Sequence, residues 1–506
     1  MIEDNTPILI GTGRITDRDT PLGDLPGPIG LMQQAAEAAL AEAGQGAERW
    51  AELDTVVVVK SFRESARNSP MALAGRLGAD KARGWLMPDG GNGPQYLVNR
   101  YADAIARGKA GTVLLAGAEA KDSVRRLKKD GRRPDWSEPP ESDADWLVPD
   151  VPMNSEHEQR HGVWLAALVY PLFETALRGR YGHDIETHQQ AMGDLFARFS
   201  AVAAETPGAW FPIRRSPEEI ATAGPTNRFV GWPYTKFMNA MNHVDQSAAV
   251  LMTSVGTARR WGVDPSRWLF LHGCADTNEP MLMSERENFH SCPAIGMLGR
   301  QARAMAGMDL EQIDLFDLYS CFPSAVAIAR DELGLAVDDP RPLTVTGGLP
   351  YHGGAGNNYV MSAIARMAER LRAAPDSVGM VTANGGYLTK HAAGIYSTRP
   401  IEGPWRRQDP TGYQAELDAR PRPPFTETPE GAGVIETYTL AYGREGRPEQ
   451  AILYGRLGDG ADPTAPRFLA NTPADPDLLD AMAREEFLGT RGTVTTGEKR
   501  NLFRPA

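Results

Sequence analysis

Short apolar stretches alternate with longer amphipathic ones along the first 120 residues and again from residue 268 to about residue 400. A short apolar run predicts a buried strand, and apolar residues recurring every three or four positions predict a helix. In the first stretch the pattern predicts strand 8–16, helix 28–43, strand 53–60, helix 69–77, strand 84–88, a helix from residue 93 and strand 112–116. In the second it predicts strand 268–272, helix 293–306, strand 313–318, helix 323–335, a helix from about residue 357 to 371 and strand 378–382. This alternation indicates an α/β fold with a largely parallel sheet covered by helices.

The stretch 347–391 is glycine-rich at both ends of its predicted helix. Its apolar positions recur at helical spacing, and Asn357 or Asn358 is placed to cap the first turn. The strand that follows ends in the turn Asn384-Gly385-Gly386. Glycines let a ligand approach the backbone, and the N–H groups of a helix start favour an oxyanion or a phosphate. We therefore expect a ligand site where these loops meet.

A similar pattern occurs earlier in the chain. The run 93–98 (GPQYLV) matches 356–361 (GNNYVM) in residue type and order, and both open a helix that leads to a buried strand and a small-residue turn. A second pair of matching segments lies near residues 50 and 310. Two matches in the same order indicate an internal duplication, although any two strand–helix–strand units share some likeness.

The regular alternation of predicted strands and helices is absent from the middle and the end of the chain. Residues 121–244 contain a basic run, an acidic proline-rich excursion, two predicted helices (164–180 and 188–204) and a long loop with several aromatic residues. Residues 244–261, rich in small residues, predict another helix. A proline- and arginine-rich linker follows residue 400, and predicted strands 433–442, 450–457, 466–471 and 492–496 with helix 475–486 indicate a small β-barrel of the oligonucleotide/oligosaccharide-binding (OB) type.

Composition narrows the class of protein. At 506 residues the chain exceeds a single hydrophobic core, and no apolar run is long enough to span a membrane. The N-terminus lacks the regions of a signal peptide, so we expect a cytoplasmic protein. A net charge of -12 argues against a nucleic-acid binder. The three cysteines are far apart and match neither a disulfide framework nor a metal-binding spacing, so we expect no metal and no tightly bound cofactor.

With these motifs the chain resembles the thiolase superfamily over about residues 5–400. The segments 93–119, 244–252 (VDQSAAVLM), 316–322 (FDLYSCF), 347–354 (GGLPYHGG) and 383–387 (ANGGY) fall in the order of that family's motifs. The resemblance implies a duplicated fold of two βαβαβαββ halves in five layers, α-β-α-β-α, with an inserted loop domain that binds coenzyme A. With its extra C-terminal domain, the chain is most similar to the mycobacterial thiolase-like proteins of type 1.

The resemblance divides the chain into an N-terminal half (1–120), the loop domain (121–244), a C-terminal half (245–400), a linker (401–426) and the OB-like domain (427–506). It implies a member of the acetyl-CoA acetyltransferase family active in lipid metabolism, with a coenzyme A ester as substrate or ligand. Family members dimerise through the edge strand after the first glycine-loop helix, which we place at 112–116. The proline-rich segment or the barrel would block that edge, so monomer and homodimer both stay open.

The chain departs from the family at the catalytic motifs. Gly90 stands at the position of the nucleophilic cysteine, Gly354 at that of the histidine in the Gly-His-Pro motif, and Ala383 at that of the acid/base cysteine. Tyr319-Ser320-Cys321-Phe322 replaces the Asn-Glu-Ala-Phe or His-Asp-Cys-Phe motif. Neither glycine nor alanine can hold an acyl group or take a proton, so ordinary thiolase activity is not expected. Backbone oxyanion sites need no particular side chain and can survive such changes.

Four side chains are candidates for remaining chemistry. His352 can occupy the vacated histidine place as a base or hydrogen-bond donor, or it can be a loop histidine bonded to backbone. Tyr319 can donate to an enolate or simply fill space, and Tyr351 is a further candidate acid or base. Cys321 can be a relocated nucleophile, although a cysteine at a strand end is more often only buried.

The remaining candidates concern binding. Backbone groups in the loops are the expected oxyanion and substrate contacts, and we place them at Gly90, Gly91, Gly353, Gly354, Asn384 and Gly385. Asn384 can instead be a residue that tolerates a left-handed turn. Arg125 and Arg126, where the loop domain begins, are candidates for the phosphates of coenzyme A, although such a run is usually a solvated face.

Two functions follow. The first is an acyl-CoA-binding, thiolase-like protein that makes or breaks a carbon–carbon bond without an acyl-cysteine, as in a retro-aldol step, with Tyr319, Tyr351 or His352 as acid or base. The second is a non-catalytic protein that binds an acyl-CoA or lipid ligand and a partner. The aromatic residues of the barrel look like core positions, which argues against a platform for nucleic acid.

Overall fold

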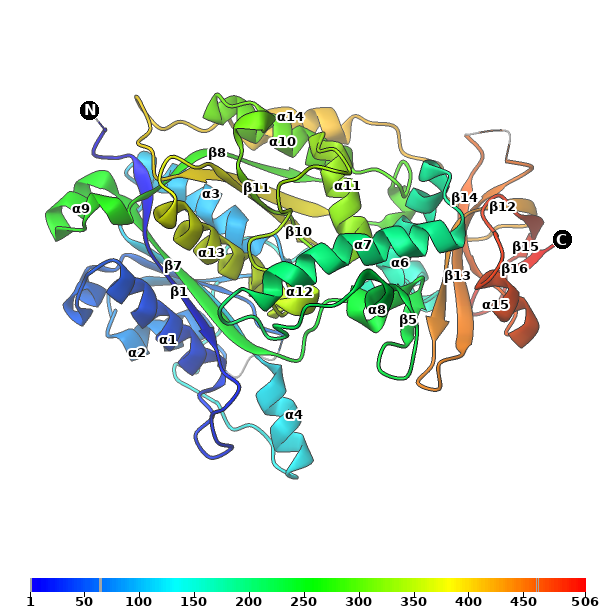
Figure 1. Cartoon of the computed structure of the whole chain (residues 1–506), viewed down its shortest axis with the longest axis horizontal. Helices are drawn as coiled ribbons and strands as arrows, with labels where there is room; N and C mark the ends of the chain where they lie inside the picture. The colour runs from blue at the N-terminus through cyan, green and yellow to red at the C-terminus, as the bar shows by residue number, and fades with distance from the viewer. Residues whose placement is uncertain (1, 63–65, 461, 463) are drawn as a thin grey trace.

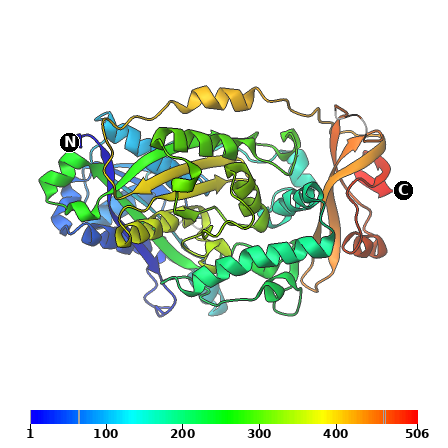
Figure 2. The same ribbon diagram turned by 45° about the horizontal axis from the view of Figure 1, so that its top comes forward.

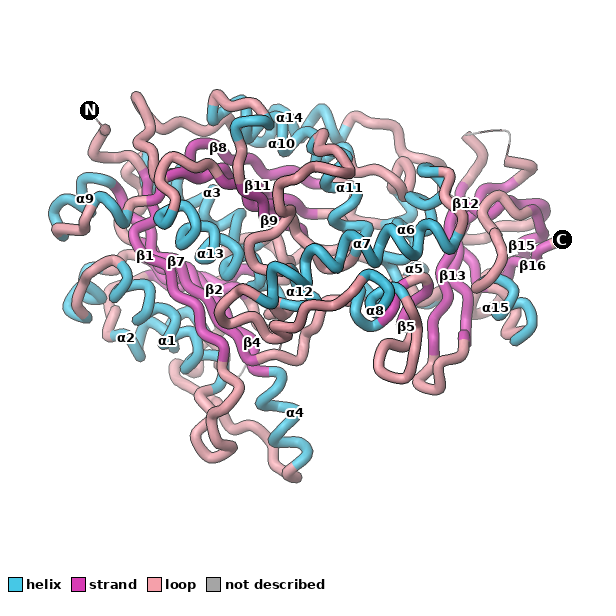
Figure 3. Tube along the Cα trace, viewed as in Figure 1, coloured by secondary structure: helices cyan, strands magenta, loops and turns pink. Residues whose placement is uncertain are grey.

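The structure is a computed structural model that describes residues 2–62, 66–460, 462 and 464–506. Two sheets organise it: a nine-stranded sheet and a seven-stranded one (Figures 1 and 3). Among these residues no helix is both long and apolar enough to cross a bilayer.

The nine-stranded sheet is built from two similar halves. The strand order is β3-β2-β4-β7-β1-β8-β11-β10-β9. In the first half β2 is parallel to β4, β4 is antiparallel to β7, and β7 is antiparallel to β1. The second half repeats this arrangement: β9 is parallel to β10, β10 is antiparallel to β11, and β11 is antiparallel to β8. The halves meet where β1 pairs with β8, Ile8 opposite Phe270 and Leu9 opposite Leu269. This repeat confirms the predicted duplication.

The elements of the first half are β1 (Pro7–Thr16), α1 (Gly27–Glu42), β2 (Thr55–Val59), α2 (Ser69–Leu77), β3 (Arg83–Met87), α3 (Gly93–Ala106), β4 (Val113–Ala120) and β7 (Asp245–Ser254). Those of the second are α9 (Val255–Trp261), β8 (Leu269–Asn278), α10 (Pro293–Ala306), β9 (Leu315–Asp317), α11 (Pro323–Leu333), α12 (Gly348–Tyr351), α13 (Tyr359–Ala373), β10 (Gly379–Gly385) and β11 (Lys390–Ser397).

Helices α3 and α13 form the central layer. Each contacts strands from both halves, whereas α1 packs against β1, β4 and β7, and α10 against β8 and β11. The layers therefore follow the predicted order α-β-α-β-α. Because α3 and α13 are covered on both sides, their glycine loops lie deep between the two halves.

Three local predictions are corrected. Residues 244–261 are not one helix: β7 occupies the first part and only α9 is helical. β7 is buried on both faces between α1 and α13, so it lacks the polar face that would reveal a strand. Asn358 lies at the start of α13, but its side chain donates to the carbonyl of Gly117 at 2.6 Å and does not cap the helix.

The third correction concerns the sheet edge. Strand 112–116, part of β4, is not an edge strand, because β2 and β7 pair with it on either side. The edge strand is β3, and the proline-rich segment covers part of it. The N–H of Leu86 donates to the carbonyl of Asp145 at 2.8 Å, and that of Leu147 donates to the carbonyl of Leu86 at 2.9 Å.

Between β4 and β7 lie α4 (Lys121–Lys129), α5 (Glu156–Arg160), α6 (Ala166–Tyr181), α7 (Ile185–Ala204), α8 (Pro217–Ala221), β5 (Phe229–Trp232) and β6 (Tyr234–Thr235). The long helix α7 begins three residues earlier than predicted, because Asp184 caps it by accepting from the N–H of Thr187.

The C-terminal elements are α14 (Pro410–Asp418), β12 (Gly431–Tyr442), β13 (Pro448–Leu457), β14 (Arg467–Asn471), α15 (Pro476–Met482), β15 (Arg491–Thr495) and β16 (Leu502–Pro505). Strands β12 to β16 close into a five-stranded barrel through the β12–β13 pairing, and β5 adds to β12 from outside the barrel. The segment with α14 runs along the outside of the α/β body to reach the barrel (Figure 2, gold). An OB-type barrel stays a prediction.

Arg467 joins the barrel to the α/β body. Its side chain is fully buried on β14 and pairs with Glu436 at 2.5 Å. It also donates to the carbonyls of Ser284, Arg286 and Glu287. A buried cation with this many partners holds the two parts in one orientation, because each lost partner would leave a buried carbonyl or carboxylate without a donor.

We expect Arg467→Met to lower the free energy of unfolding by about 3 kcal/mol, because it leaves buried acceptors without a hydrogen-bond donor. Arg420→Met is the matched control: Arg420 pairs with Glu287 at 2.6 Å, but both side chains are nearly half exposed. Its loss should cost less than about 1 kcal/mol. Chemical denaturation of the two variants measures the difference; equal costs would contradict this role of Arg467.

Candidate ligand site at the glycine loops

Two glycine loops touch at the centre of the molecule. One is Gly90-Gly91, which leads into α3, and the other is the end of β10 at Gly385. A Cβ on Gly385 would lie 3.0 Å from the Cα of Gly90 and 2.3 Å from Oδ1 of Asn92. A Cβ on Gly91 would lie 2.2 Å from the hydroxyl oxygen of Tyr319. Only glycine therefore fits at Gly91 and Gly385 without displacing these neighbours.

A third loop, at Gly353 and Gly354, joins them through an asparagine. Oδ1 of Asn357 accepts from the N–H of Gly90 at 2.9 Å, and its Nδ2 donates to Asp89 at 2.9 Å. The N–H of Gly354 donates to the carbonyl of Met241 at 2.9 Å. The N–H groups of Gly90 and Gly354, both expected to face an oxyanion, are thus satisfied within the protein.

Asn384 is held by a tyrosine from α6. Its Nδ2 donates to the hydroxyl of Tyr170 at 2.8 Å, and that hydroxyl donates to the carbonyl of Gly386 at 3.0 Å. Oδ1 of Asn384 is buried and has no hydrogen-bond partner among the described residues. A small enclosed void of about 10 Å³ lies beside Asn384, Tyr319 and Ala383. It has about the size of one water molecule.

Tyr319 and Cys321 follow β9 and approach this place from the second half. The hydroxyl of Tyr319 packs against Gly91, and its N–H donates to Oγ1 of Thr382 at 3.0 Å. Burial raises the pKa of the Tyr319 hydroxyl well above its usual range. Burial also raises the pKa of the Cys321 thiol to about 12. At neutral pH Tyr319 is a hydrogen-bond donor, and Cys321 is a thiol rather than a nucleophilic thiolate.

His352 and Tyr351 lie at the end of α12 and are buried. Both ring nitrogens of His352 and the hydroxyl of Tyr351 lack hydrogen-bond partners among the described residues. Burial lowers the pKa of His352 to about 3, and it raises the pKa of Tyr351 well above its usual range. The rings of His352 and Tyr319 both pack edge-on against Tyr359, at 6.0 and 5.9 Å. His352 is therefore neutral and a very weak base.

Arg125 and Arg126 lie on α4, which projects from the body at the bottom of Figure 1. Arg125 pairs with Asp122 at 2.5 Å, and Nη2 of Arg126 donates to the carbonyl of Thr20 at 2.7 Å. Both side chains are engaged in local contacts.

Sequence reasoning missed a lysine at the glycine loops. Nζ of Lys390, on β11, donates to the carbonyl of Asp89 at 2.5 Å and would lie 3.1 Å from a Cβ on Gly90. Burial lowers its pKa, and the nearby Asp150 and Asp89 raise it. Lys60 pairs with the same Asp89 at 2.8 Å. The only sequence signal was the Thr-Lys-His that follows the Asn-Gly-Gly-Tyr turn.

The fold and the glycine loops define the class as the thiolase fold. The Ascaris suum Acat5 thiolase, solved in complex with coenzyme A, matches at 14% identity over 78% of this chain and 99% of its own (TM-score 0.56). The Ltp2–ChsH2(DUF35) aldolase matches at 18% identity over 79% and 100% (TM-score 0.60). A search of curated proteins gives no match.

Within that class, the chain belongs to the SCP2-thiolase-like protein type 1 family. It is 37% identical, over 100% of both chains, to a monomeric protein of that family from Mycobacterium smegmatis, with a TM-score of 0.86. Residues 413–499 also match the family model of the thiolase-like protein type 1 additional C-terminal domain.

The buried histidines make stability depend on pH. Burial lowers the pKa of His391, like that of His352, to about 3 from 6.5. Between about pH 6.5 and pH 3 the unfolded chain binds more protons at these sites, so they make the free energy of unfolding fall as pH falls. His352→Phe should reduce this slope by up to about 1.4 kcal/mol per pH unit.

Urea denaturation at several pH values below 7 measures the slope. The exposed His243, replaced in the same way, is the control and should leave it unchanged. A slope that His352→Phe does not alter would mean that His352 is protonated in the folded protein.

Proposed function

We propose that the protein binds a coenzyme A thioester at the glycine loops and polarises its carbonyl with hydrogen-bond donors instead of forming an acyl-cysteine. The observation that carries this proposal is that Tyr319 and Lys390 flank the Gly90-Gly91 loop, where a side chain at Gly91 would collide with Tyr319. An un-ionised phenol and an ammonium group are both donors. Donors directed at one place stabilise a carbonyl oxygen as it gains negative charge.

The absence of a thiol is part of the proposal. Gly90, Gly354 and Ala383 occupy the places that carry the family's catalytic side chains, and Cys321 is buried against Tyr170. Burial raises the pKa of Tyr319 and of Cys321, so neither is ionised near neutral pH, and it lowers the pKa of His352 to about 3, so this imidazole is a very weak base. We therefore expect no thiolysis of 3-ketoacyl-CoA.

A retro-aldol reaction of a 3-hydroxyacyl-CoA suits this arrangement. The 3-hydroxyl loses its proton, the C2–C3 bond breaks, an aldehyde or ketone leaves, and the electron pair forms a thioester enolate that is then protonated at C2. Tyr319 and Lys390 would stabilise the enolate oxygen, and the Asp89 carboxylate at the same loop would accept the hydroxyl proton. The aldolase among the thiolase-fold structures supports this reaction class.

Binding without turnover is the second candidate. The N–H groups of Gly90 and Gly354 already have protein acceptors, and the void beside Tyr319 and Asn384 is only about 10 Å³. A site that is closed in this way has to open before a thioester can reach Tyr319.

The test combines calorimetry and turnover. Coenzyme A and a 3-hydroxyacyl-CoA are titrated into the protein, and aldehyde or ketone release is followed by mass spectrometry. Tyr319→Phe and Lys390→Met should each lower the rate of release by about 100-fold or more, as loss of an oxyanion donor does. His352→Phe, a buried change away from the donors, should leave it within a few-fold.

Calorimetric binding with no product would support the second candidate. No binding of either ligand would refute both. Thiolysis of acetoacetyl-CoA by the unmodified protein would show that a nucleophile is present and would overturn the proposed mechanism.

We also propose that the protein is a monomer. The segment that pairs with Leu86 of β3 occupies backbone groups that a second copy would need to extend the sheet. The relative from Mycobacterium smegmatis is monomeric. Light scattering coupled to gel filtration should give the mass of one chain at micromolar concentration, and twice that mass would contradict the proposal.

A further inference from the structure

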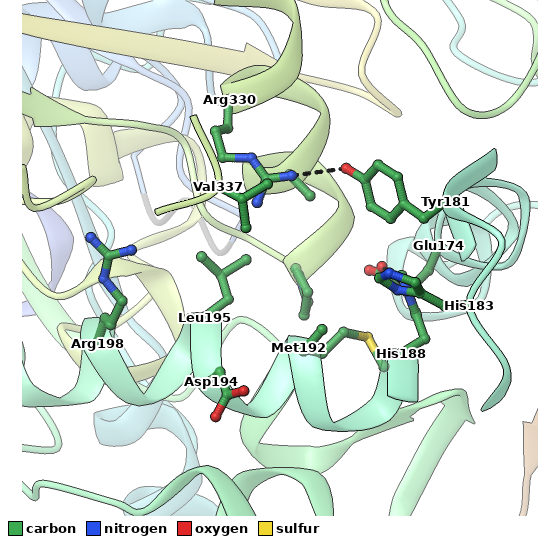
Figure 4. Close-up of a pocket in the computed structure, with 13 residues that line it drawn as sticks. Glu174, Tyr181, His183, His188, Met192, Asp194, Leu195, Arg198, Arg330 and Val337 are labelled. Atoms are coloured by element: carbon green, nitrogen blue, oxygen red, sulfur yellow. Dashed lines mark hydrogen bonds and ion pairs between the residues drawn. The ribbon is translucent and has the colours of Figure 1, made fainter. Parts of the chain in front are cut away.

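A cavity of about 390 Å³ lies outside the glycine-loop site, among α6, α7 and α11 (Figure 4). Its volume falls within the range of small-molecule sites. The apolar side chains that line it come from α7, from α11 and from the segment after α11: Ala191, Met192, Leu195, Pro323, Ala327 and Val337. Val337 is 71% exposed, so it contributes apolar surface with little protein cover.

A chain of buried polar groups ends at this cavity. The hydroxyl of Tyr234 donates to Oε2 of Glu174 at 2.6 Å. Nε2 of His188 lies 2.7 Å from Oε1 of the same carboxylate, and Nδ1 of His188 lies 3.3 Å from Nδ1 of His183. Tyr234, Glu174 and His188 are almost fully buried, whereas His183 is partly exposed and lines the cavity.

One arrangement of protons in this chain leaves Nε2 of His183 as a hydrogen-bond acceptor. We assign the proton between His188 and Glu174 to Nε2 of His188, and the proton between the two histidines to Nδ1 of His183, so that Nδ1 of His188 is the acceptor. Nε2 of His183 then keeps its lone pair. Burial lowers the pKa of His183, which favours the neutral form of this side chain.

The other polar groups at the cavity have hydrogen-bond partners of their own. Tyr181 donates to Asp331 at 2.6 Å and accepts from Arg330 at 2.9 Å, and Arg330 pairs with Asp331 at 2.7 Å. Nη2 of Arg198 donates to the carbonyls of Asp339 and Arg341. Nε2 of His183, whose ring is held by the buried chain, is therefore an acceptor at the cavity that has no hydrogen-bond partner among the described residues.

We propose that this cavity binds a neutral, mainly apolar molecule whose hydroxyl group donates a hydrogen bond to Nε2 of His183. A hydroxyl can donate to a lone pair, whereas an ionised carboxylate cannot. A carboxylate head would also approach the carboxylates of Glu174 and Asp194, which both line the cavity. Of the two arginines that line it, Arg330 is already paired with Asp331, and Arg198 donates to backbone carbonyls. The apolar walls receive the hydrocarbon part of the ligand.

Three probes with eight carbon atoms each test the head group by isothermal titration calorimetry: octanol, its isomer heptyl methyl ether and octanoate. Octanol should bind about fivefold more tightly than the ether, which has no hydrogen to donate; one hydrogen bond accounts for about that factor. Octanoate should bind more weakly than octanol. Equal binding of octanol and the ether, or preference for octanoate, would overturn the proposal.

Two variants locate the binding. His183→Phe removes the acceptor but keeps a ring of similar size, so it should lower octanol affinity to that of the ether. Leu195→Trp, on the partly exposed side of α7, should fill the cavity and abolish binding of both probes. Gln190→Trp is the matched control, since it places the same side chain on α7 outside the cavity lining and should leave both affinities unchanged.

Octanol binding that survives Leu195→Trp would place the ligand elsewhere and refute the proposal, as would an absence of octanol binding to the unmodified protein. Thermal unfolding of each variant shows whether it is folded. The result is independent of the glycine-loop proposal, because loss of coenzyme A binding is measured with different ligands and with Tyr319 and Lys390 variants.

Discussion

The direct contact of backbone with backbone at the glycine loops is the constraint on which the rest of the structure depends. Gly90 and Gly385 come from different halves of the duplicated fold, and even one methyl group on Gly385 would lie 3.0 Å from the Cα of Gly90. Such contacts are shorter than packed carbon atoms allow, so a side chain there would force α3 away from β10. The loop before α3 and the end of β10 approach each other this closely because neither Gly90 nor Gly385 carries a side chain.

The same close packing decides which chemistry the junction can support. Water is largely excluded, and each titratable group inside the junction shifts toward its neutral form. Tyr319 keeps its proton, Cys321 stays a thiol and His352 stays an uncharged imidazole. Lys390 lies at the margin, where Asp89 and Asp150 offset part of the effect of burial. The junction thus favours hydrogen-bond donation over nucleophilic attack.

The spacing of apolar residues predicted correctly those helices and strands whose sequence shows a single clear period. The duplication was visible because the helices that start at Gly93 and Tyr359 each follow a glycine loop and precede an apolar strand. β7 was misread because a strand buried on both faces has no alternation, and its small residues also suit a helix face. The proline-rich segment was expected to block a sheet edge, but the edge was placed at 112–116 instead of β3. The pairing with Leu86 could not be predicted, because this segment lies about 60 residues away and has no strand pattern of its own.

The sequence predicted where the candidate site lies, but it did not predict which side chains there can act chemically. The motifs placed Gly90, Tyr319 and Asn384 near one another, and the structure brings them together. The state of each group depends on burial, which is a property of the whole fold. The contact of Lys390 with Asp89 and the hydrogen-bonded groups from Tyr234 to His183 join residues that are far apart in sequence, so no local spacing predicts them.

Helix α6 connects the three parts of the molecule through residues on successive turns. Tyr170 holds Asn384 and the turn at Gly386, and Glu174, one turn later, holds the polar chain that leads to the cavity. Between them the carbonyl of Leu172 accepts from Oγ1 of Thr437 in the barrel, and one turn after Glu174 the side chain of Arg178 pairs with Glu486. A helix of this length moves as a unit, so the barrel and the cavity both fix the position from which Tyr170 orients Asn384. The C-terminal barrel is therefore part of the support of the glycine-loop site, although none of its described residues lies there.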